Sequence, residues 1–154
     1  MWTRSFIIST ASDLGDLPFV TNRLLQNPSD FADILRVFYG NEKANQFKDL
    51  FTQHILIAAE LVNAAKQGDT KKVETARKNW YANADAIALF LADINPNWNQ
   101  KEWQLLLYSH LKMTEAEAIT RLSEKHEENV KLYDAIEDEA LKMADYMYYG
   151  LHGR

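Results

Sequence analysis

Breaks in regular structure are rare in this chain. Its 154 residues include only 5 glycines and 3 prolines, which stand at a few places along the sequence. Glycine and proline are the residues that most often end or kink a regular element. In the segments between these glycines and prolines, apolar residues recur at intervals of three and four, which is the spacing of side chains on one face of a helix. The sequence therefore predicts an all-α fold made of long helices.

These breaks divide the chain into a series of expected helices. A first helix is predicted over residues 2–25, with a kink at Gly15 and Pro18, because proline lacks the N–H group and clashes with the preceding turn. A short helix is expected over residues 29–39, with Ser29 as its N-cap. Four long helices are then expected over residues 41–67, 70–94, 99–122 and 123–150.

The turn before the last helix is marked less clearly than the others. Ser123 can act as an N-cap there, and this position gives long helices of similar length. Residues 114–117, Thr-Glu-Ala-Glu, have the spacing of a capping box and mark a rival turn. With Ser123, the pattern predicts an up-down four-helix bundle with a kinked first helix and a short extra helix. We expect a single domain over residues 1–150 and a flexible tail over residues 151–154.

The apolar positions that face the interior of this bundle follow from the helical period. We expect seven of them to be buried: Leu50, Leu61, Trp80, Ile87, Leu107, Ile119 and Ile136.

Charge and composition exclude several classes of protein. The net charge is −5, and the 17 Lys and Arg residues are dispersed rather than gathered in a basic stripe, so we expect no appreciable nucleic-acid binding. No apolar run approaches the roughly 20 residues that span a bilayer.

The apolar stretch at the N-terminus is too short for a secretory signal, so we expect a cytoplasmic protein, although a signal could have been removed. Without cysteine there is neither a disulfide nor a thiol nucleophile.

Polar residues interrupt the apolar faces of the four long helices, one in each. They are His54, Asn83, His110 and Glu137. Each residue of a helix advances the chain by the same distance along the helix axis. Two positions that lie equally many residues before and after a turn are therefore at the same height in the bundle. By this count all four polar residues lie at similar heights. The first helix can add Asp13 or Asp16 at a similar depth. We therefore expect one polar layer near the middle of the bundle.

Imidazoles and carboxylates in one layer suit a polar pocket for a small molecule or a site for a divalent metal. The metal ligands would be His54, His110 and Glu137. The Glu-x-x-His spacing of di-iron carboxylate bundles is absent from the sequence. The leading hypothesis is a binding or interaction protein with a pocket at this layer.

Two other functions fit the same residues. One is a metal-dependent enzyme that uses the histidines and Glu137, with Asp13 or Asp85. The other is a purely structural bundle, in which the buried histidines and Asn83 satisfy one another by hydrogen bonds or fix the register of the helices. The sequence specifies no cofactor, substrate or oligomeric state.

Several short segments resemble those of a known family. They are Trp2-Thr3-Arg4-Ser5-Phe6-Ile7-Ile8-Ser9, His54-Ile55-Leu56-Ile57-Ala58, Asn83-Ala84-Asp85-Ala86-Ile87-Ala88 and Asn95-Pro96-Asn97-Trp98. The chain is similar over most of its length to a family of small all-helical proteins from spore-forming bacteria. Some members are named acetylglutamate kinases, but this sequence has neither the strands nor the glycine-rich nucleotide loops of such a kinase. The resemblance therefore implies a helical domain and no activity.

Overall fold

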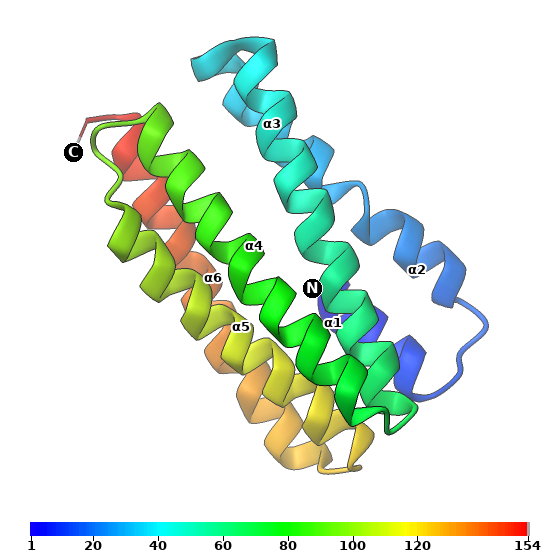
Figure 1. The fold of residues 1–154 in the computed structure, drawn as a ribbon. Helices are drawn as coiled ribbons and strands as arrows, with labels where there is room; N and C mark the ends of the chain where they lie inside the picture. Colours follow the sequence, from blue (N-terminus) through cyan, green and yellow to red (C-terminus); the bar gives the residue numbers. More distant parts are fainter. Residues whose placement is uncertain (154) are drawn as a thin grey trace.

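A computed structural model of the chain describes residues 1–153 and shows six helices and no strand among them (Figure 1). The prediction of an all-α fold is confirmed. The helices are α1 (Trp2–Ala11), α2 (Leu17–Leu24), α3 (Asn27–Lys66), α4 (Thr70–Ile94), α5 (Gln100–Leu122) and α6 (His126–Leu151). Within the described residues, no helix has both the length and the apolar character needed to cross a membrane.

The turns between the long helices lie where the sequence predicted them. At the α3–α4 turn, Gly68 has a φ of 69° and the Asp69 side chain accepts a hydrogen bond from the backbone N–H of Lys72. The α5–α6 turn follows Ser123, but Ser123 ends α5 and does not cap α6. The reason is that Glu124 has a φ of 59° and extends the turn. The rival turn at residues 114–117 lies inside α5 and was wrong.

The predicted short helix and the first long helix are joined in α3. Gly40 interrupts α3 with a φ of 76° and a ψ of 178°, so the chain changes direction there. The N-cap assigned to Ser29 was wrong. Helix α3 already begins at Asn27 because Pro28 fits its first turn, where the missing N–H group needs no partner.

The single kinked helix predicted over residues 2–25 is also wrong, because two separate helices form there. Helices α1 and α2 contact each other and are joined by a loop (Figure 1). In that loop Asp13 has a φ of 51°, which no helix accommodates. Pro18 lies in the first turn of α2, where it starts a new helix and does not bend an old one.

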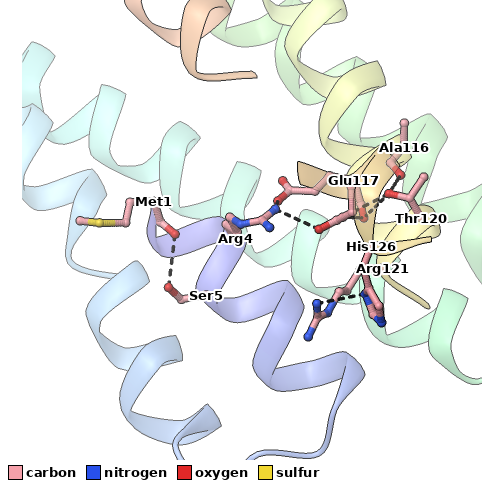
Figure 2. A network of polar contacts seen from close by, with 9 residues as sticks. Met1, Arg4, Ser5, Ala116, Glu117, Thr120, Arg121 and His126 are labelled. Carbon is pink, nitrogen blue, oxygen red and sulfur yellow. Dashed lines mark hydrogen bonds and ion pairs between the residues drawn. The ribbon is translucent and has the colours of Figure 1, made fainter. Parts of the chain in front are cut away.

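Consecutive long helices pack side by side, α3 with α4, α4 with α5 and α5 with α6, while α1 packs against both α3 and α5. Arg4 fixes α1 in this position (Figure 2). Its guanidinium donates to Oε1 of Glu117 in α5 at 2.6 Å and to Oδ1 of Asn129 in α6 at 3.0 Å. It also lies 4.7 Å from the ring centroid of Tyr133. Helix α1 thus closes the side of the structure where α3, α5 and α6 face one another.

The far end of α6 is held by the loop between α4 and α5. Asn95 and Asn97 both donate side-chain hydrogen bonds to the carbonyl of Gly150, at 3.0 and 3.1 Å. Trp98 packs directly over Gly150, and its indole N–H donates to the carbonyl of Tyr146. Leu151 belongs to α6, is half-buried and packs against the core. Of the predicted tail over residues 151–154, residue 154 lies outside the described residues.

Most of the predicted core is confirmed. Leu61, Trp80, Ile87 and Ile136 are buried, while Leu50 and Leu107 are half-buried. Ile119 is 49% exposed, so its assignment to the core was wrong. Its neighbours Ala118 and Thr120 are buried in its place, because α1 covers this end of α5 on a slightly different face from the one that the spacing indicated.

Candidate ligand-binding cavity

A cavity of about 270 Å³ lies at the centre of the molecule, and all six helices contribute to its wall. Most of the lining is apolar, with Phe6 and Ile7 from α1, Phe51 from α3, and Met143 and Met147 from α6. Ala140 and Ala144 of α6 line the cavity and are also exposed to solvent. The cavity therefore opens to the outside beside α6.

Two of the predicted polar residues, His54 and Asn83, are directly bonded to each other beside this cavity, and His54 lines it. Nδ1 of His54 lies 2.7 Å from Oδ1 of Asn83, and Nε2 of His54 lies 3.1 Å from the indole N–H of Trp80. Because indole can only donate and the amide oxygen can only accept, His54 carries its proton on Nδ1. Asn83 also donates to the carbonyl of Leu50 at 3.1 Å. The three side chains form a closed network that joins α3 to α4.

Burial keeps His54 uncharged. Burial lowers the pKa of His54 from 6.5 to about 4, against the opposing effect of the hydrogen bond that His54 donates to Asn83; the neighbouring His110 lowers it further. Both ring nitrogens are occupied, so His54 has no free position for a ligand or a metal. Its role in the cavity is structural.

His110 differs from His54 although it lines the same cavity. Its side chain as a whole is half-buried, yet its Nδ1 atom is shielded from solvent and has no hydrogen-bond partner among residues 1–153. Burial lowers the pKa of His110 to about 4, so this imidazole is also neutral at pH 7. An unpaired buried polar atom costs free energy. Nδ1 of His110 is therefore an unsatisfied polar atom within the packed wall of the cavity.

Two further residues of α5 offer the same feature. Oγ1 of Thr114 and Nε1 of Trp103 are buried without a partner among the described residues, and both residues line the cavity. Thr114 lies four residues after His110, and Trp103 lies seven residues before it. Side chains at these spacings lie on one face of a helix. The sequence placed neither residue in the predicted polar layer, and Thr114 appeared only in the rival turn over residues 114–117. Their shared face with His110 was the available signal.

The carboxylates predicted for the polar layer lie elsewhere. Glu137 is exposed on α6. Asp13 is exposed and pairs with Lys66, and Asp16 accepts a hydrogen bond from Ser9 at 2.7 Å beside the α1–α2 loop. Asn83, and not a carboxylate, orients the imidazole of His54. These three assignments were wrong because Glu137 is one position off the inward face of α6 and α1 ends before Asp13.

The proposed metal ligands are therefore not assembled. His54 and His110 line one cavity, but Glu137 faces solvent. Within residues 1–153, no three His, Cys, Asp or Glu side chains are grouped so as to hold a metal ion. Glu115 does line the cavity, but the guanidinium of Arg77 binds both of its oxygens.

Comparison of the chain with protein families, with curated proteins and with solved structures finds no match. The resemblance to a family from spore-forming bacteria thus stays a prediction.

Proposed function

We propose that this protein binds a small, predominantly apolar molecule in its central cavity. The observation that carries the proposal is the cavity itself, whose wall is mostly apolar and which opens to solvent beside Ala140 and Ala144. A closely packed structural core leaves few spaces larger than a water molecule. Ligand sites combine apolar walls with a few polar groups in this way.

The volume sets the size of the ligand. A cavity of roughly 150 Å³ holds benzene. By the same ratio of volume to atoms, a cavity of about 270 Å³ has room for about ten non-hydrogen atoms. In this proposal the four long helical segments, residues 41–66, 70–94, 100–122 and 126–151, form an up-down bundle around the ligand.

Naphthalene matches this size and tests the proposal. Titration of isotope-labelled protein should shift the backbone NMR signals of cavity-lining residues, with a dissociation constant on the order of 0.1 mM. Ala144→Trp should fill the mouth of the cavity and abolish these shifts. Ala135→Trp is the matched control, because Ala135 is exposed on the same helix but does not line the cavity. Absence of any naphthalene-dependent shift in the unmodified protein would refute the proposal.

A further inference from the structure

Two exposed apolar helix faces lie on the outside of the molecule, beside the opening of the cavity. Each has three apolar residues at positions i, i+3 and i+7, the spacing with which a helix presents one side to a partner. The first, called the α3 stripe below, consists of Phe31, Ile34 and Phe38. The second, called the α6 stripe, consists of Leu141, Ala144 and Tyr148.

The two stripes lie side by side and run in the same direction. Phe31 and Ala144 line the same central cavity. Further along both helices, the ring centroid of His152 lies 6.4 Å from that of Phe38 and 4.2 Å from that of Tyr148. The first part of α3 and the end of α6 accordingly lie at the same end of the molecule (Figure 1). The stripes therefore form one continuous apolar surface.

This surface is large enough for a specific interface. The five large side chains of the two stripes are between 41% and 60% exposed. With about 200 Å² for a fully exposed side chain of this size, they present about 500 Å² to solvent. Two copies that cover these side chains bury about 1,000 Å² in total, which is the lower limit for a specific interface.

The surface is also complementary to itself. Because both stripes run in the same direction, a two-fold axis along the groove between them places the α3 stripe of one copy on the α6 stripe of the other. Ile34 of one copy then meets Ala144 of the second copy, so a large side chain faces a small one. Neither stripe contains a charged residue, so a partner of opposite charge finds no group to pair with there.

We propose that two copies of this chain associate through the α3 and α6 stripes, with Ile34 of each copy packed against Ala144 of the other. The proposal does not depend on a ligand in the cavity. Since Ala144 borders the opening of the cavity, a ligand enters the monomer, which a weak dimer releases by dissociation.

Sedimentation equilibrium of the full chain at pH 7 tests the proposal. We expect a dimer with a dissociation constant on the order of 10 µM, as for interfaces near the lower size limit. The average mass should rise from that of one chain to that of two as the protein concentration passes through this value. A chain that stays monomeric at a concentration about tenfold higher would overturn the proposal, and so would a mass that continues to rise beyond two copies.

Variants test whether the dimer uses this surface. Ile34→Glu places a charge at the centre of the interface and should weaken association at least about tenfold. Tyr148→Glu should act in the same direction from the α6 stripe. Leu105→Glu is the matched control, because Leu105 is 57% exposed on α5 and lies outside both stripes and the cavity. Circular dichroism checks that each variant is folded. Dimerisation of Ile34→Glu at the unmodified strength, or equal weakening by Leu105→Glu, would contradict the proposal.

Cysteine cross-linking tests how the stripes pair, since the chain has no cysteine of its own. An equimolar mixture of Ile34→Cys and Ala144→Cys, oxidised with glutathione disulfide, should form a covalent dimer of the two variants. A mixture of Leu105→Cys and Ala144→Cys should not. A chain that dimerises without this cross-link would overturn the pairing of Ile34 with Ala144.

Discussion

The indole N–H of Trp80 points at Nε2 of His54 across the interface between α4 and α3, at a distance of 3.1 Å. This bond uses the ring nitrogen that Asn83 leaves free, so the imidazole has a single tautomer and a single orientation. Trp80 and His54 are 2% and 7% exposed. This hydrogen bond is shielded from water, because both residues are buried. It therefore holds α3 and α4 in one fixed register.

Removal of one partner from this network should destabilise the protein. In Asn83→Leu, the Nδ1–H group of His54 remains buried without an acceptor. We expect the free energy of unfolding to fall by about 1–3 kcal/mol, measured by urea denaturation. In the double variant His54→Leu/Asn83→Leu, fewer buried polar groups are left unpaired, so its loss should be smaller than the sum of the two single losses. Strict additivity would contradict the proposed coupling.

The depressed pKa values of the two histidines predict a loss of stability in mild acid. The pKa of His54 and of His110 is about 4 in the folded chain, whereas an unfolded histidine titrates near about 6.5. Between these values the unfolded chain binds more protons, so stability falls as pH decreases from about 6.5 towards about 4. At pH 4.5 the loss should approach about 2–3 kcal/mol for each imidazole.

Comparison with a variant isolates this effect from the titration of carboxylates. Urea denaturation of the unmodified protein and of His110→Phe at pH 7 and pH 4.5 should give a smaller acid-dependent loss in the variant, by about 2–3 kcal/mol. Equal losses in the two proteins would show that His110 does not titrate in this way.

A methyl group at residue 150 should disrupt the end of α6. A Cβ atom added to Gly150 would lie 1.8 Å from Nε1 of Trp98, which is itself buried and cannot move away freely. We expect Gly150→Ala to cost about 1–3 kcal/mol, measured by thermal or urea denaturation. Gly15→Ala is the control, since no atom lies within 4 Å of the added group, and its stability should stay within about 0.5 kcal/mol of the unmodified protein.

The ion pair between Arg4 and Glu117 should determine how firmly α1 is held. The Glu117 side chain is only 3% exposed, and burial raises its pKa although Arg4 opposes the effect. Arg4→Met would leave this carboxyl group without its partner and should cost about 3 kcal/mol. Hydrogen exchange should speed up selectively in residues 2–11. The double variant Arg4→Met/Glu117→Leu should recover part of the stability, and a further loss would argue against the pairing.

The sequence predicted those features of the fold that depend on local chemistry. The turn at Gly68 and Asp69 was predictable because a left-handed residue followed by a capping carboxylate is a local signal. The proximity of His54 and Asn83 followed from counting residues away from this turn. The position of α1 was not predictable, because the contact between Arg4 and Glu117 joins residues 113 positions apart.

The site was predicted only in part, for a similar reason. Spacing along one helix indicated that His54 and His110 face inward, but whether each nitrogen finds a partner depends on the neighbouring helices. Trp80 satisfies His54, and no described residue satisfies Nδ1 of His110. Glu137 shows the limit of the periodic pattern, since a displacement of one position turns a side chain by roughly 100° around the helix and carried this one to the solvent.

The closure of the cavity by α1 has a consequence for the order of folding. Helices α3 to α6 pack against their neighbours in the chain, and such local contacts form quickly. Helix α1 is synthesised before α2 to α6, yet its anchoring partners Glu117 and Asn129 follow Arg4 by 113 and 125 residues. We therefore expect α1 to dock late, onto helices that have already assembled.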